Sequence, residues 1–188
     1  MPTLTMIAGP NGSGKSSITA SRNITNVIDP DAIAKALNPT DPSHAAIASG
    51  RQAILRARQC IAQLDSFTIE TTLAGNGPLA LFRDAKEAGF ELKLIYVALT
   101  TPDLHMERVQ LRFSRGGHDV PDTDIRRRYF RSMANAPVAI RMAGVAEVLD
   151  NSGDAPFRLF EFRNGALSWK HPGSIPAWAA EIEHALAT

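Results

Sequence analysis

Eight consecutive residues near the start of the chain have the types and spacing of a phosphate-binding loop. Gly9 to Ser16 match G-x-x-x-x-G-K-[ST] at every fixed position. The glycines allow backbone N–H groups to turn toward an anion. Lys15 supplies a positive charge to the outer phosphates, and the Ser16 hydroxyl can ligate Mg²⁺. The residues expected to bind a nucleotide phosphate are therefore Gly9, Pro10, Asn11, Gly12, Ser13, Gly14, Lys15, Ser16 and Ser17.

Two carboxylates, Asp29 and Asp31, follow a strand that the sequence predicts at 25–29. In an open parallel sheet, residues at the carboxyl ends of strands face the ligand crevice. A carboxylate there can accept the proton of a hydroxyl as a phosphoryl group arrives. We expect Asp31 to be this base, because Asp29 precedes Pro30 and is the better helix cap. The alternative is that both carboxylates only cap the helix and complement its dipole.

A second group of polar residues, Glu70, Thr71 and Thr72, ends the next predicted strand. Because parallel strands end at the same edge of a sheet, this group should lie on the same rim as Asp31. A carboxylate and two hydroxyls suit hydrogen bonds to a polyol or to metal-bound water. The alternative is an ordinary strand exit without a ligand.

Arginines concentrate in one part of the chain, from residue 108 to residue 131. That span holds seven arginines and three acids, in a chain whose formal net charge is +1. Arg108, Arg112 and Arg115 are spaced by four and three residues, so they share one helix face. The span 108–136 predicts a hinged cationic lid whose arginines offset charge on a transferring phosphoryl group. His118, beside two glycines in the hinge, either contacts ligand or packs within its loop.

Two other interpretations of this arginine-rich span remain open. The first is that the arginines lie on a solvated, salt-bridged surface. At least one of the residues 126–128 should do so, because three consecutive residues cannot share a helix face. A nucleic-acid stripe is disfavoured by the near-neutral total charge and by the shortage of interleaved aromatic residues.

Apolar stretches and helical patterns alternate along the chain, which predicts an α/β fold with a parallel sheet flanked by helices. We expect one domain over 1–188, with a hairpin and a helix over about 156–188 at its edge. Pro137 is expected to interrupt the helix that begins at Asp122. The predicted strands are 3–8, 25–29, 67–70, 91–99, 145–149, 157–162 and 166–169, and the predicted helices start near 15, 30, 43, 78, 102, 122 and 176.

Composition narrows the class of protein. With 188 residues and 44% hydrophobic content, the chain can bury a full core. Cys60 is the only cysteine, which excludes disulfides and cysteine zinc sites and favours the cytoplasm. No apolar run is long enough to span a membrane, and we expect no signal peptide. A guanine-reading N-K-x-D motif is absent, and we expect no apolar strand to end in the Asp, or the Asp-Glu pair, that is typical of motor and helicase ATPases. These observations favour a small-molecule kinase.

The ordered set of these motifs resembles the zeta toxin family of bacterial phosphate-loop kinases. The resemblance covers roughly residues 3–152. It is carried by the segments Ala8–Ser16, Asp29-Pro30-Asp31, Glu70-Thr71-Thr72-Leu73, Arg115-Gly116-Gly117-His118-Asp119-Val120-Pro121 and Asp150-Asn151-Ser152.

The resemblance implies a phosphate-loop kinase that uses ATP and Mg²⁺ to phosphorylate a hydroxyl of a UDP-sugar such as UDP-N-acetylglucosamine. It also implies a small antitoxin protein as partner. By motif position, Lys15 and Ser16 would hold phosphate and Mg²⁺, and Asp31 would be the base. Glu70 and Thr72 would contact the sugar nucleotide. Arg108 and Arg115 would contact ATP phosphates, with Arg112 as a competitor for the role of Arg108.

The acceptor stays open at this point. Asp29 stands where the family commonly has Asn, and the chain is shorter than the well-known toxins. Other small kinases, for antibiotics, sugars or nucleosides, share much of this layout. The remaining alternatives are a nucleotide-dependent binding module and a nucleic-acid 5′-end kinase.

Overall fold

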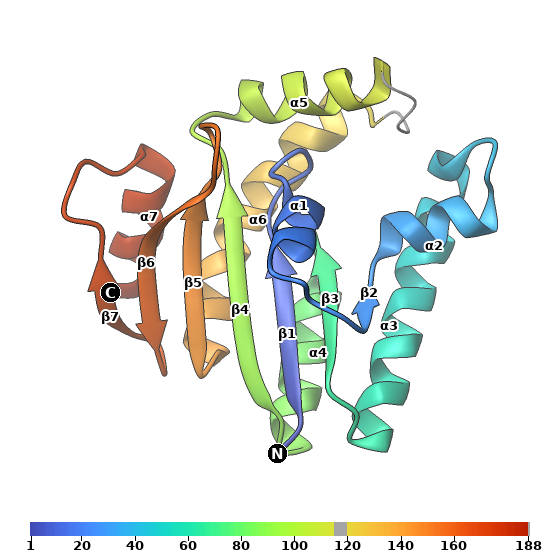
Figure 1. Cartoon of the computed structure of the whole chain (residues 1–188), viewed down its shortest axis with the longest axis horizontal. Coiled ribbons are helices and arrows are strands. Elements are labelled where there is room, and N and C mark those ends of the chain that lie inside the picture. The colour runs from blue at the N-terminus through green and yellow to red at the C-terminus, as the bar shows by residue number, and fades with distance from the viewer. Residues whose placement is uncertain (115–119, 188) are drawn as a thin grey trace.

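The chain forms one mixed β-sheet with helices on both faces (Figure 1). The computed structural model describes residues 1–114 and 120–187. Within that part, the sheet has seven strands in the order β2-β3-β1-β4-β5-β6-β7. The first five in this order are parallel, and β6 and β7 are antiparallel. The strands are β1 Thr3–Ala8, β2 Val27–Ile28, β3 Phe67–Thr71, β4 Glu91–Ala98, β5 Val145–Asp150, β6 Phe157–Arg163 and β7 Ala166–Lys170.

The centre of the sheet is the most apolar part of the chain. β1 lies between β3 and β4, so both of its faces are covered. Leu4, Met6 and Ile7 are fully buried, as expected for a parallel strand with helices above and below it. The predicted parallel sheet is therefore confirmed, and the carboxyl ends of its strands share one edge.

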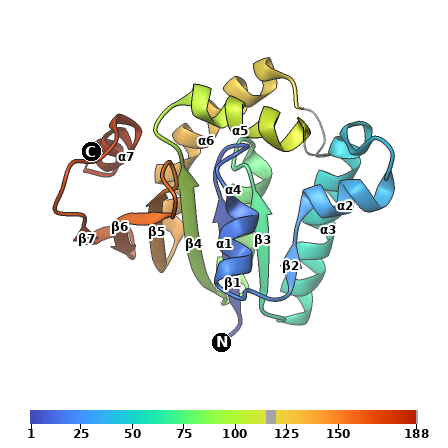
Figure 2. The same cartoon turned by 45° about the horizontal axis from the view of Figure 1, so that its top comes forward.

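The helices place different chain segments around that edge. In Figure 1, α1 lies in front of the sheet, α4, α6 and α7 lie behind it, and α5 crosses above the strand ends. Figure 2, with the top turned forward, shows α5 and α6 over the end of β4, opposite α2 and α3. The bounds are α1 Lys15–Ser21, α2 Pro30–Leu37, a 3₁₀ helix Pro42–Ala45, α3 Ala46–Gln63, α4 Asn76–Glu87, α5 Pro102–Ser114, α6 Asp122–Met142 and α7 Ala177–Ala187.

One helix differs from expectation. Pro137 was expected to interrupt the helix, but α6 continues through it to Met142. Pro137 is buried, and its neighbours Ala136, Ala139 and Ile140 are buried in the main core. Packing of this apolar face keeps the helix continuous despite the missing N–H group.

The second strand is shorter than predicted. Its regular part covers only Val27–Ile28, because Asn26 adopts a left-handed conformation with φ of 53° and its amide donates to the Ser66 carbonyl. At the other end, Asp29 already caps α2. Two local signals therefore restrict the strand from both sides.

The predicted hairpin at the sheet edge is confirmed. Asn164 and Gly165 have φ values of 49° and 78°, the two positive values that a primed turn requires. Strands β6 and β7 pair antiparallel on either side of that turn. No helix within residues 1–114 and 120–187 is long and apolar enough to cross a membrane.

Candidate active site

The phosphate loop, residues 9–16, joins β1 to α1 and has the shape that its glycines allow. Gly14 is the N-cap of α1 with φ of 90°, a left-handed conformation that favours glycine. Gly9 approaches β4 so closely that a Cβ there would lie 1.9 Å from the Val97 carbonyl oxygen. Its N–H donates to the Thr71 carbonyl at 3.2 Å, which ties the loop to the end of β3. The loop is thus held between its two neighbouring strands.

Lys15 lies over this loop. Its Nζ donates to the carbonyls of Gly9 at 2.9 Å and Pro10 at 3.2 Å. Desolvation lowers the pKa of the ammonium group, and the nearby carboxylates of Asp31 and Glu70 oppose that shift. The cation is therefore held where a phosphate on the loop would meet it.

Glu70 joins the loop side of the site. This carboxylate is 4% exposed and accepts hydrogen bonds from Ser16 Oγ at 2.9 Å and Thr19 Oγ1 at 2.6 Å. Hydroxyl and carboxylate oxygens are the ligands that Mg²⁺ prefers, together with water and substrate phosphates. The donor set around Ser16 therefore fits Mg²⁺. Among the described residues no group of three or more acidic, His or Cys side chains could hold a metal.

The two aspartates have the different environments that the sequence suggested. Asp29 Oδ1 accepts a hydrogen bond from the Asp31 N–H at 2.9 Å and caps α2. Burial raises the pKa of the Asp29 carboxyl, and the charge of Glu70 raises it further. The Asp31 side chain is 55% exposed, and its Oδ2 lies 3.6 Å from Arg112 Nη1. Asp31 is thus the accessible carboxylate beside the lid.

A cleft of about 630 Å³ connects these groups. Most predicted site residues line it. The exceptions among the described residues are Gly9, Pro10 and Ser13, which are buried within the phosphate loop. Arg115 and His118 lie outside the described residues. The predicted residues that line the cleft are Asn11, Gly12, Gly14, Lys15, Ser16, Ser17, Asp31, Glu70, Thr71, Thr72, Arg108 and Arg112.

The lid arginines divide between cleft and surface. Arg108 and Arg112, from α5, line the cleft. On α6, Arg126 forms an exposed ion pair with Asp103 at 2.8 Å and faces away from the cleft. Arg128 lines the cleft together with Asp124, and the sequence interpretation did not select it. Its position in a run of three arginines concealed which of them faces inward.

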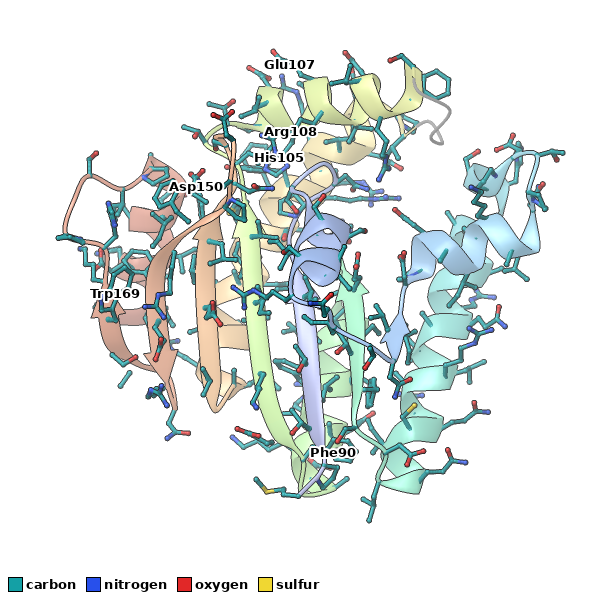
Figure 3. All side chains as sticks on the ribbon, viewed as in Figure 1. Phe90, His105, Glu107, Arg108, Asp150 and Trp169 are labelled. Atoms are coloured by element: carbon teal, nitrogen blue, oxygen red, sulfur yellow. The ribbon has the colours of Figure 1, made fainter. Side chains whose placement is uncertain are left out.

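Two further residues were missed as parts of the site. His105 hydrogen-bonds the Asn11 carbonyl, and Asn151 hydrogen-bonds the Ser13 carbonyl, so both contact the phosphate loop from behind. Asn151 stood within the Asp150-Asn151-Ser152 motif, but no local pattern pointed to His105. Figure 3 shows His105, Arg108 and Asp150 around the upper end of β4.

Comparisons with known proteins agree with this fold. A chain of the complex AvrRxo1-ORF1:AvrRxo1-ORF2, solved with sulphate ions and with ATP, superposes with a TM-score of 0.73 at 14% identity, and the match covers 100% of this chain and 76% of that chain. The PezAT toxin–antitoxin system of Streptococcus pneumoniae gives a TM-score of 0.58 at 14% identity, covering 97% and 78%. No family model matches the chain.

The sheet order, the phosphate loop and these structures define the class: the chain has the zeta-toxin-like fold of phosphate-loop kinases. A protein of Haemophilus influenzae, named "Uncharacterized protein", is 36% identical over 123 residues, which are 64% of this chain and 88% of that protein. The chain belongs to the family of this Haemophilus influenzae protein.

Proposed function

We propose that the protein is an ATP-dependent kinase that transfers the terminal phosphoryl group to a hydroxyl of a small molecule. One observation carries this proposal. The phosphate loop with Lys15 and the accessible carboxylate of Asp31 line the same cleft, beneath the arginines of α5. Phosphoryl transfer needs these parts: an anion cradle, a proton acceptor and cations over the transferring group. The AvrRxo1 complex solved with ATP supports the choice of donor.

In this mechanism the loop N–H groups and Lys15 bind the outer phosphates. Asp31 takes the proton of the acceptor hydroxyl while its oxygen forms the new bond to phosphorus. The bond to the bridging oxygen breaks, and that oxygen leaves with its electron pair on ADP. Arg108 and Arg112 stabilise the charge on the transferring group. Bound at Ser16, with Glu70 beside it, Mg²⁺ would neutralise charge on the phosphates.

For the acceptor we propose a UDP-sugar such as UDP-N-acetylglucosamine. Two features support a sizeable acceptor. The cleft volume of about 630 Å³ has room for more than the donor phosphates, and its wall beyond Asp31 is formed by small and apolar residues that suit a ring system. These wall residues are Ala34, Pro42, Ala46, Ala53, Ile54, Ile69 and Pro78. A different metabolite, such as an antibiotic, sugar or nucleoside, is the alternative acceptor.

We further propose that the protein acts in the cytoplasm, where ATP is supplied, and that a small antitoxin restrains it. Both AvrRxo1-ORF1:AvrRxo1-ORF2 and PezAT are pairs, and PezAT is a toxin–antitoxin system. Affinity purification of the tagged protein from cells of its native host, with mass spectrometry of what co-purifies, tests the partner. Growth arrest on expression of the chain alone tests toxicity.

The decisive experiment is an acceptor screen. The purified protein is incubated with Mg-ATP and a panel of UDP-sugars, sugars, nucleosides and aminoglycosides, and products are analysed by mass spectrometry. A mass gain of one phosphate identifies the acceptor. ATP binding without any phosphorylated product would indicate a binding module instead.

The base is tested with a matched pair of variants. Asp31→Asn removes the proton acceptor and should lower kcat by about 100-fold or more while ATP still binds. Asp29→Asn keeps an oxygen that can cap α2, so kcat should fall less in this variant than in Asp31→Asn. An Asp31→Asn variant with native kcat would remove Asp31 from the role of base.

A further inference from the structure

The carbonyl groups of the phosphate loop are held from outside by two buried side chains. The first is His105, from α5, which is 0% exposed. Its Nε2 lies 3.1 Å from the Leu99 N–H, which can only donate. Nε2 is therefore the acceptor and Nδ1 carries the hydrogen, so Nδ1–H donates to the Asn11 carbonyl at 2.7 Å.

The second side chain is Asn151, in the loop after β5. Its Nδ2 donates to the Ser13 carbonyl at 2.8 Å, and its own N–H donates to the Ala98 carbonyl at 3.0 Å. The amide occupies space that only glycine leaves free, since a Cβ at Gly14 would lie 2.3 Å from Asn151 Nδ2. The fit between Gly14 and Asn151 is therefore specific.

The loop after β5 also holds α5. Asp150 Oδ1 accepts from the Ser152 N–H at 2.7 Å, Ser152 Oγ accepts from the Thr100 N–H at 2.7 Å, and the Ser152 carbonyl accepts from Arg108 Nη2 at 3.3 Å. The phosphate loop, the start of α5 and the loop after β5 thus form a closed framework of hydrogen bonds. Each of these three segments is hydrogen-bonded to the other two.

Fixing a carbonyl also fixes the N–H group that follows it. A trans peptide is planar, and its C=O and N–H point in opposite directions. The Asn11 carbonyl shares a peptide with the Gly12 N–H, and the Ser13 carbonyl shares one with the Gly14 N–H. Holding these carbonyls on the outside therefore turns the two glycine N–H groups toward the cleft, which both glycines line.

We infer that His105 and Asn151 are positioning residues that hold the phosphate loop in its anion-binding shape before a ligand arrives. Without them, the Gly12 and Gly14 peptides can rotate and place a carbonyl where a phosphate must bind. Preorganised donors bind an anion without the cost of ordering the loop. The identity of that anion as a nucleotide phosphate rests on the proposed function, whereas the shape of the loop does not.

Amide hydrogen exchange of the ligand-free protein measures the loop directly. Asn151→Asp replaces the donor with an acceptor of the same shape, and should speed exchange of the Ser13 N–H, the loop amide that donates to the Pro10 carbonyl at 3.3 Å, by about tenfold, the value of one lost hydrogen bond. Asn26→Asp is the matched control. It removes a similar amide–carbonyl hydrogen bond, to Ser66, at the far end of the sheet, and should leave loop exchange unchanged. If Asn151→Asp does not fold, Asn151→Ala removes the donor without adding charge.

A pair of substitutions tests His105. The Nδ2 of His105→Asn stands near the former Nδ1 and can still reach the Asn11 carbonyl, whereas the longer His105→Gln reaches toward Leu99 instead. Loop exchange should therefore be faster in His105→Gln than in His105→Asn. Equal exchange in the two variants would remove His105 from this role.

Binding of Mg-ADP by calorimetry separates the two proposals. Weaker binding by about tenfold in Asn151→Asp, with faster loop exchange, supports both. If loop exchange is faster in Asn151→Asp but the native protein binds no ADP, the positioning role is supported and the proposed function is overturned. Loop exchange in Asn151→Asp equal to that of Asn26→Asp overturns the positioning role, whatever the native protein binds.

Discussion

At the scale of single residues, Glu70 has the most specific environment in the cleft. It was predicted at the rim from its place at the end of β3, with either a polyol or metal-bound water as its contact. Its hydrogen bonds to Ser16 and Thr19 place it beside the phosphate loop. A buried carboxylate there contributes negative charge where a cation would accompany phosphate. Glu70 therefore belongs to the side of the cleft where the phosphate donor would bind.

Glu70→Gln tests this position. The amide keeps one acceptor for the two hydroxyls but loses the charge, so turnover should fall about 10- to 100-fold and the Mg²⁺ concentration for half-maximal turnover should rise, as for residues beside metal ligands. Glu147→Gln is the matched control, because Glu147 pairs with Arg22 on a part-exposed face away from the cleft. A Mg²⁺ dependence that is the same in native protein and Glu70→Gln would contradict the assignment.

The sequence was a good guide to residues with local signals and a poor guide to the others. The phosphate loop and the Asp29 cap depend on neighbours a few positions away, so their types and spacing predict them. The contact between His105 and Asn11 joins residues 94 positions apart. Only the fold brings such pairs together, and no sequence pattern predicts which residue a lone histidine in a helix will contact.

At the scale of elements, the hairpin of β6 and β7 shows how far turn chemistry alone can specify structure. Asn164-Gly165 predicts a primed turn, and both residues have positive φ. The helix through Pro137 shows the opposite case. There proline predicts an interruption, but the packing of a long buried face keeps α6 continuous. Local rules therefore predict short elements better than they predict the ends of helices packed on the core.

Gly165→Ala tests the turn. Its φ of 78° is strained for any residue with a Cβ, and the new atom would lie 3.4 Å from Arg141 Cα, so the free energy of unfolding should fall by about 1–2 kcal/mol. Gly153→Ala is the control, since its Cβ would meet nothing within 4 Å. Urea denaturation measures both. A Gly165→Ala variant as stable as Gly153→Ala would contradict the strain argument.

At the scale of the whole molecule, the buried His105 makes stability depend on pH. Burial lowers its pKa from 6.5 to about 4 in the folded protein. Between these values the unfolded chain binds the proton and the folded protein does not, so stability is undiminished above pH 6.5 and falls as the pH is lowered toward 4. The loss over this window is about 3 kcal/mol for a shift of this size.

Chemical denaturation at pH 7 and at pH 4.5 measures this loss. Carboxylates also titrate in part of this range, so the comparison is made against His105→Asn, which has no group of this pKa. The free energy of unfolding should fall more steeply with acid in the native protein than in His105→Asn. Equal slopes would show that folding does not lower the pKa of His105.

The two sides of the cleft come from different stretches of the chain. The donor side uses residues 11–17 and α5, whereas the apolar wall uses α2, α3 and the start of α4. Substitutions in the apolar wall can therefore change the acceptor among relatives, while the residues that bind ATP stay the same. Chimeras that exchange only residues 30–63 between two family members should carry acceptor preference with the exchanged segment and leave the ATP requirement with the host.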